Sequence, residues 1–402
     1  MKRVWATAML ATAGLGLHLV ATVAVATYAM AEAAADQVDR GPMLQSLAPT
    51  RALVLVRSFE LTRGEIRFGP RGDLDRTLES SSSHRHVFAL TSLDPDVEYE
   101  YQVTLEADAG SPRSYPARRF RTPPAAGDEG ELRVVVVGDT GVSPAQDAII
   151  ELIEELEAPI LLHAGDLVHE PGTVESYDAR FFSVWEAVLG QTSLYPVLGN
   201  HDCWASPDGF LDEVQLPTNS VTETEHYYSF DAGDAHFVAL NSCDGLVDST
   251  QLDWLERDLS STERGWIIVW LHHPLYSNGV QSGSRALRTS LAPLFERYGV
   301  DLVFAGHDHA YERFLPIAGE SLSDAYQSPE FVNPAGVTYI VSGGGGAELG
   351  RPRYAEDALL SAVYRPVHHV VELSIREHEL EMRAIGLDGE EVDRLRIRKD
   401  TG

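Results

Sequence analysis

The spacing of apolar residues along the chain changes near residue 130. Before that point, short runs at residues 52–56, 64–68 and 86–90 are separated by Gly, Pro, Asp and Ser turns, a pattern typical of antiparallel strands. Beyond it, residues 132–137 form an almost continuous apolar run, as expected for a strand in a sheet covered on both faces. The pattern therefore predicts a small all-β domain followed by an α/β domain.

Strands and helices are expected to alternate through the second domain, which favours a mainly parallel sheet. Strand-like runs occur at residues 132–137, 159–164, 194–198, 236–240, 266–271, 302–305 and 338–341. Helical stretches occur at residues 145–156, 179–189, 251–259 and 286–298. Two further strand-like runs, at residues 368–374 and 379–385, are expected to close the domain.

Three segments are predicted: 1–35, 48–124 and 131–390, with a linker rich in Pro, Gly and acidic residues between the last two. Segment 1–35 starts with Met-Lys-Arg and carries no charged residue from 4 to 31, which is typical of a secretory signal. The run is also long enough for an uncleaved N-terminal anchor, the one membrane contact that the sequence suggests. In both cases the folded part is expected to be periplasmic, extracellular or on the cell surface.

The chain is strongly acidic, with a formal net charge of -30 over 402 residues. Such a surface repels nucleic-acid phosphates and argues against a nucleic-acid binder. It also repels phosphorylated substrates at long range, so a phosphatase of this composition needs local positive charge, which bound metal would supply. Cys203 and Cys243 are the two cysteines; in an oxidising compartment they could form one disulfide, but the sequence leaves their proximity open.

Polar residues follow the predicted strands directly, where the loops of an open α/β sheet converge on one crevice. The candidate metal ligands among them are Asp139, Asp166, Asn200, one of the neighbours His272 and His273, His307 and His309. Carboxylate, amide and imidazole ligands suit two first-row ions, such as iron with zinc, manganese or a second iron, better than calcium or thiolate-bound zinc. Such a pair activates water, so in-line attack by metal-bound hydroxide on a phosphate ester is expected.

In chain order, the motifs Gly-Asp, Gly-Asp, Gly-Asn-His, His-x-Pro and Gly-His-x-His-Ala-Tyr-Glu-Arg resemble those of the calcineurin-like metallophosphoesterases. The last motif, at residues 306–313, and a preceding segment that resembles a fibronectin type III module resemble the purple acid phosphatases in particular. The resemblance implies a four-layer α/β/β/α sandwich after the small β domain. It also implies hydrolysis of small phosphate monoesters. A phosphodiesterase or nucleotide phosphatase with the same metals, or a non-catalytic exported binding protein, is the alternative.

The resemblance also assigns roles to the candidate residues. Asp139 and His309 are expected to bind the first metal and Asp166 to bridge both. The second metal is expected to be held by Asn200, His272 and His307. His201 is expected to bind the phosphate or protonate the leaving oxygen, and Asp202 to orient it.

One position departs from the purple acid phosphatase pattern. The family carries a tyrosine three residues after the bridging aspartate, and its bond to ferric iron gives the colour, whereas this chain has His169 there. His169 replaces the tyrosine as a ligand of the first metal, or the position is left to water. In both cases the iron-loaded protein is expected not to be purple. Trp204 and Tyr276 are interpreted as either pocket-lining or core residues.

Overall fold

The computed structural model describes residues 39–108, 110–141, 143–205, 208–319, 321–322, 329–353 and 360–400. The predicted signal or anchor, residues 1–35, lies outside the described residues. Across the part of the chain that is described, no helix combines the length and the apolar character needed to cross a membrane.

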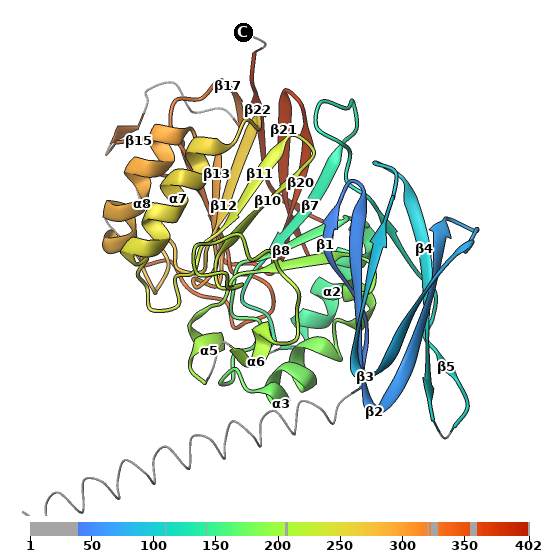
Figure 1. The fold of residues 1–402 in the computed structure, drawn as a ribbon. Helices are drawn as coiled ribbons and strands as arrows, with labels where there is room; N and C mark the ends of the chain where they lie inside the picture. Colours follow the sequence, from blue (N-terminus) through green and yellow to red (C-terminus); the bar gives the residue numbers. More distant parts are fainter. Residues whose placement is uncertain are drawn as a thin grey trace, which may run out of the picture.

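The N-terminal region is a small all-β domain of six strands (Figure 1). Its strands are β1 (Arg40–Ala48), β2 (Arg51–Pro70), β3 (Arg76–Thr91), β4 (Glu98–Ala107), β5 (Arg113–Ser114) and β6 (Arg118–Arg121). All pairings are antiparallel, and the long strand β2 pairs with three others, β1, β3 and β4. Buried and less buried residues alternate along β4, because successive side chains of a strand point to opposite faces.

Two runs that the sequence suggests as separate strands, residues 52–56 and 64–68, are parts of the single strand β2. The pairing of β2 with β3 shifts register between Arg57 and Thr62 and again between Thr62 and Gly64. Irregular pairing of this kind bends a strand without ending it. The polar residues between the two apolar runs therefore mark a bend rather than a turn.

The second domain contains two seven-stranded sheets. The first sheet has the order β17 (Glu330–Val332), β22 (Glu391–Arg398), β21 (Glu379–Gly386), β20 (His369–Arg376), β7 (Leu132–Val137), β8 (Ile160–His163) and β9 (Ser193–Pro196). The second has the order β10 (Tyr228–Ala232), β11 (Ala235–Ala239), β12 (Trp266–Trp270), β13 (Leu302–Ala305), β18 (Thr338–Ser342), β14 (Tyr311–Phe314) and β19 (Ser361–Arg365). A two-stranded ribbon, β15 (Ile317–Ala318) and β16 (Ser321–Leu322), lies outside both.

Parallel strands form the centre of each sheet. In the first sheet β7, β8 and β9 are parallel, and in the second β11, β12, β13 and β18 are parallel. Their residues are buried almost without interruption, because both faces of each sheet are covered.

Helices cover the outer faces of the two sheets. Helices α7 (Ser249–Ser261) and α8 (Arg285–Tyr298) cover the second sheet, and α2 (Ala145–Leu156) lies on the far side of the first (Figure 1). One apolar core joins both sheets and α2, and a second fills the space between the second sheet and α7 and α8. The four-layer α/β/β/α sandwich preceded by a small β domain is therefore confirmed.

Most predicted elements exist, and a second difference concerns a helix. The helix expected at residues 179–189 is instead three pieces, α3 (Val174–Tyr177), a π-helical turn (Asp178–Phe182) and α4 (Glu186–Leu189). The domain limits 48–124 and 131–390 stay predictions. Strand β1 begins before residue 48, and β22 lies beyond residue 390.

A buried ion cluster joins the two domains. Arg40 on β1 pairs with Asp178 at 2.6 Å and with Glu213, and Arg57 on β2 pairs with the same Glu213 at 2.9 Å. The hydroxyl of Tyr101 on β4 also donates to the Gly190 carbonyl at 2.7 Å. Because these groups are shielded from water, their pairing fixes the β domain against the α/β domain.

The two cysteines form a disulfide, Cys203–Cys243. Cys203 ends the short helix α5 (Asn200–Cys203), and Cys243 lies in the loop that follows β11. The disulfide therefore ties two loops at the same end of the sheets.

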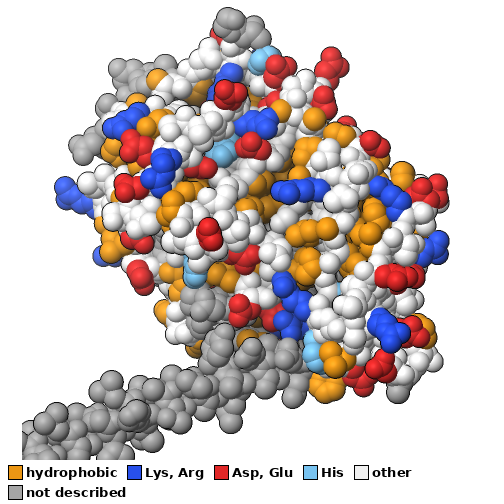
Figure 2. Space-filling view, viewed as in Figure 1, with side chains coloured by type: hydrophobic (Ala, Val, Ile, Leu, Met, Phe, Trp, Pro, Cys, Tyr) orange, Lys and Arg blue, Asp and Glu red, His pale blue; other side chains and the backbone are white. Residues whose placement is uncertain are grey.

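On the face drawn in Figure 2, acidic and basic side chains are interspersed over both domains. The arginines neutralise nearby carboxylates, as in the pairs of Arg297 with Glu256 and of Arg398 with Glu379. Such exposed pairs contribute little to stability.

Candidate metal centre

The candidate ligands come from loops at one end of the parallel strands. Asp139 follows β7, Asp166 follows β8, and Asn200 opens α5 after β9. From the second sheet, His272 follows β12, and the pair His307 and His309 lies between β13 and β14. The structure therefore gathers side chains that are up to 170 residues apart along the sequence.

Three of these residues have left-handed backbones. The φ angles of Asp139, Asp166 and His307 are 61°, 51° and 70°. Residues with a Cβ adopt this region at a cost, and such strain persists where the surrounding structure enforces it, often at functional sites. The turns at Asp139 and Asp166 direct their side chains into the common site, and the turn at His307 borders it.

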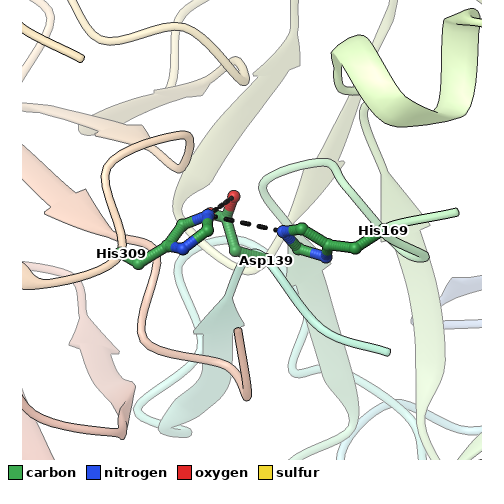
Figure 3. Close-up of side chains that lie close together, drawn as sticks. All are labelled: Asp139, His169 and His309. Carbon is green, nitrogen blue, oxygen red and sulfur yellow. Dashed lines mark hydrogen bonds and ion pairs between the residues drawn. The ribbon is translucent and has the colours of Figure 1, made fainter. Parts of the chain in front are cut away.

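One group of possible ligands consists of Asp139, His169 and His309 (Figure 3). The Nε2 atom of His309 lies 3.4 Å from Asp139 Oδ1 and 3.4 Å from His169 Nε2. Asp139 Oδ1 is buried and has no hydrogen-bond partner within the described residues. Two imidazole nitrogens and a buried carboxylate oxygen that face one another suit a shared cation.

Two further groups overlap with the first. Asp166, His169 and His201 form one, and Asp139, Asp166 and His272 form the other. In each group the possible ligand atoms lie within 4.8 Å of one another. Because Asp139, Asp166 and His169 each belong to two groups, the three groups make a single continuous site.

The second ring nitrogen of three histidines is held by a backbone carbonyl. The Nδ1–H groups of His169, His272 and His309 donate to the carbonyl oxygens of Thr140, Ala164 and Glu348 at 2.8–2.9 Å. Such bonds fix the tautomer and orient the ring, as around metal-binding histidines in general. Each Nε2 is thereby left available, so the donor set fits the metals that the sequence predicts.

Asn200 and His307 lie at the edge of this site. Asn200 Oδ1 is 3.1 Å from His272 Nε2. The backbone N–H of His307 donates to Asp139 Oδ2 at 2.9 Å, and its ring packs beside those of His272 and His273, with centroids 5.1 and 4.4 Å away. Within the described residues, His307 belongs to none of the three groups.

The charges of the site are strongly coupled. Burial alone would raise the pKa of Asp166. His272, together with His169 and His201, lowers this pKa by more than burial raises it, so the pKa lies far below its usual range. Burial lowers the pKa of His272, whereas Asp166 raises it to about 9, and Asp139 raises the pKa of His309 to about 9 in the same way. The carboxylates of the site therefore favour nearby positive charge. Protons and metal ions compete to supply this charge.

His201 and Asp202 lie on the short helix α5 and bond to the loop that follows β8. The backbone N–H of His201 donates to Asp166 Oδ1 at 2.9 Å, and its ring Nε2 is 3.9 Å from Asp166 Oδ2. Asp202 accepts from the N–H groups of Gly199 and Leu167 and from the Tyr177 hydroxyl. In the described part of the chain, the buried Nδ1 atom of His201 has no hydrogen-bond partner, so Asp202 does not bond to this ring nitrogen.

Asp202 instead fixes the loop that carries His201. Burial and the neighbouring Asp166 raise the pKa of Asp202 to about 7. Its bonds to Gly199 and Leu167 hold the loop after β9 against the loop after β8. Tyr177, which completes this set, carries no motif that sequence reasoning can recognise.

The glycine segment 343–346 is buried and packed against the site. A Cβ at Gly343 would meet Asp139 Oδ2 at 2.7 Å and the Asp308 carbonyl. The Gly345 N–H donates to the Gly138 carbonyl at 2.9 Å. These glycines therefore let the backbone after β18 approach the first aspartate closely.

The residues after His309 support the site without entering it. Arg313 makes a two-point pair with Asp393, and Tyr311 donates to the same carboxylate at 2.6 Å. Glu312 accepts from both the backbone and the side chain of Asn278. The motif that follows Gly-His-x-His thus anchors β14 next to the metal-binding loop.

The comparisons with known proteins agree with this geometry. Residues 132–311 match the family model described as calcineurin-like phosphoesterase. The chain is 27% identical to "Purple acid phosphatase 23" of Arabidopsis thaliana, over 68% of this chain and 64% of that protein. It is 27% identical to "Acid phosphatase type 7" of Mus musculus, over 81% of this chain and 75% of that protein.

Among solved structures, the purple acid phosphatase PPD1 from yellow lupin seeds superposes with a TM-score of 0.79 at 20% identity, covering 90% of this chain and 75% of that one. The fold is that of the metallophosphoesterases, and it places the clustered Asp and His side chains at one end of the parallel strands. The chain is therefore similar to the calcineurin-like phosphoesterases over residues 132–311 and, within them, to purple acid phosphatases. It spans less than two thirds of the length of the first plant relative.

Proposed function

We propose that this protein hydrolyses small phosphate monoesters with the help of two bound metal ions. The observation that carries the proposal is the continuous site of three overlapping ligand groups, which share Asp139, Asp166 and His169. The names of the relatives as acid phosphatases support the reaction class. The expected metals are iron with zinc, manganese or a second iron.

In this proposal each side chain has one role. Asp139, His169 and His309 would hold the first metal, Asn200, His272 and His307 would hold the second, and Asp166 would be shared by both. When bound, the metals offset the charge of the phosphate and lower the pKa of water. Since the ring of His307 lies beside the groups rather than inside one, its ligation needs the ring to turn toward His272.

His201 is proposed to act on the ester oxygen that leaves. Its backbone is fixed by the bond to Asp166, and burial lowers the pKa of its ring. In the substrate complex, the negative phosphate restores the proton at Nε2, which then passes to the leaving oxygen. Asp202 acts as a positioning residue by fixing the loop.

The test combines elemental analysis with a panel of phosphate esters. We expect about two metal ions per chain and faster hydrolysis of p-nitrophenyl phosphate than of bis-p-nitrophenyl phosphate. Asp166→Asn and Asn200→Ala are expected to lower both metal content and kcat/KM by about 100-fold or more. The exposed His378→Ala variant is the control. A preference for the diester would favour a phosphodiesterase, and metal-loaded protein inactive on every ester would contradict the proposal.

We also propose that the folded part acts outside the cytoplasm. The Cys203–Cys243 disulfide supports this, since such bonds persist in oxidising compartments. Fractionation of cells that express the full chain, with N-terminal sequencing of the product, tests both export and cleavage near residue 35. Recovery of the protein with reduced cysteines in the cytoplasm would contradict it.

A further inference from the structure

Trp204 is a large apolar side chain with an unusual position beside the metal centre. It directly follows the Asn-His-Asp-Cys helix α5, and 61% of its surface is exposed. Its indole packs on the His201 ring with a centroid distance of 4.0 Å. The side chain thus contacts the proposed proton donor and still presents apolar surface to solvent.

Two other loops bring exposed apolar residues to the same region. Leu246 is 58% exposed and follows Gly245, at which a Cβ would lie 3.9 Å from the His273 ring. Val280 is 48% exposed. It lies close to Gly350, since a Cβ added at Gly350 would be 3.8 Å from Val280 Cγ2 and 3.6 Å from the His309 carbonyl oxygen. Trp204, Leu246 and Val280 are called the apolar rim below.

The disulfide fixes part of this rim. Cys203 precedes Trp204 directly, and its partner Cys243 lies three residues before Leu246. A covalent bond therefore joins the two loops that carry Trp204 and Leu246. By contrast Tyr276, the other aromatic residue considered for the pocket, is buried against Tyr339 and Phe314 and belongs to the core.

Building on the proposed function, we propose that the apolar rim selects phosphate monoesters whose alcohol is an uncharged aromatic ring, with Trp204 as the stacking surface. A metal-bound phosphate places its leaving oxygen next to His201, so the group attached to that oxygen extends toward the indole. Aromatic rings gain from offset stacking in addition to the area that they bury. The net charge of -30 disfavours leaving groups that carry further phosphates.

The test compares aromatic and small alkyl ligands in matched variants. Binding of 2-naphthylphosphonate and of methylphosphonate to metal-loaded protein is measured by calorimetry for wild type, Trp204→Ala and Trp204→Phe. We expect Trp204→Ala to weaken naphthylphosphonate binding about tenfold and methylphosphonate binding less than twofold. Trp204→Phe, which keeps a ring, is expected to restore most of the loss. Val221→Ala, exposed on another loop, is the control.

The same variants are assayed with 2-naphthyl phosphate and ethyl phosphate. The inference predicts a selective loss of kcat/KM for the naphthyl ester in Trp204→Ala. Equal losses for both esters, or equal binding of both phosphonates by wild type and variant, would overturn it. If wild type hydrolyses neither ester, the proposed function fails, and the binding experiment still decides whether Trp204 holds aromatic rings.

Discussion

Single backbone contacts decide which histidine nitrogen faces the metal centre. The carbonyls of Thr140, Ala164 and Glu348 each hold the Nδ1–H of one ring. The sequence shows the histidines but not these acceptors, because a backbone carbonyl has no residue-specific signature. This is why the sequence can propose which residues are ligands but cannot predict how their rings are oriented.

His169 gives a prediction about colour. We expect iron-loaded wild type to lack the visible tyrosinate-to-iron absorption band, because an imidazole occupies the tyrosine position. His169→Tyr, at a ring that faces His309 Nε2 at 3.4 Å, is expected to acquire the band. Absorption spectra of iron-loaded proteins check this, with the exposed His378→Tyr as control. A band in wild type would contradict the assignment.

A second histidine, far from the metal centre, makes stability depend on pH. His236 lies between Asp231 and Asp258 at 2.7 and 2.8 Å, and these carboxylates also contact Arg264 and Ser229. Burial lowers the pKa of His236, but the two aspartates raise it to about 9. The stabilisation is therefore complete below pH 6.5 and is lost as pH rises through about 9.

The corresponding experiment is urea unfolding of wild type and His236→Gln at pH 6 and at pH 10. We expect the variant to lose about 2–3 kcal/mol at pH 6 and much less at pH 10. His378→Gln should match wild type at both values. A loss that grows with pH would show that the charge of His236 is not the cause.

At the scale of elements, a glycine-rich segment after β18 fills the space behind the first aspartate. Gly343 leaves no room for a side chain, since a Cβ would meet Asp139 Oδ2 at 2.7 Å. Gly350, on the same segment, has room, because its nearest neighbour would be the His309 carbonyl oxygen at 3.6 Å. The two glycines therefore form a matched pair.

Gly343→Ala is expected to displace Asp139 and to lower metal content and kcat/KM at least tenfold. Gly350→Ala should leave both within about twofold of wild type. Elemental analysis and steady-state kinetics on both variants check the prediction. Normal metal content in Gly343→Ala would mean that the backbone after β18 yields without disturbing the site.

Element types followed from the sequence where the apolar pattern was long. Helix α2 has the predicted limits, and β13 does too. The helix expected at residues 179–189 is broken because Phe181 and Phe182 pack with Trp185 and Phe210 in an aromatic cluster. Such a tertiary contact, which imposes a π-helical turn, leaves no periodic signal in the sequence.

At the scale of the whole molecule, the contact between the two domains includes Glu213, which pairs with Arg40 and Arg57 in a buried cluster. Glu213→Ala leaves these guanidinium groups without that carboxylate, and we expect a loss of about 3–5 kcal/mol. Glu256 pairs with Arg297 on the exposed surface, and Glu256→Ala should lower the free energy of unfolding by only about 0–1 kcal/mol. Denaturant unfolding of both variants measures the difference, and equal losses would contradict the role of burial.

The covalent bond between Cys203 and Cys243 has a practical consequence for anyone producing this protein. It closes a loop of about 40 residues, a constraint worth roughly 3–4 kcal/mol, and it borders the segment that bears Asn200 and His201. Recombinant material made in a reducing host will lack this restraint beside the reaction centre. If the protein has the proposed activity, material without the disulfide is expected to be less active than the oxidised protein, and thiol reductants do not belong in its purification buffers.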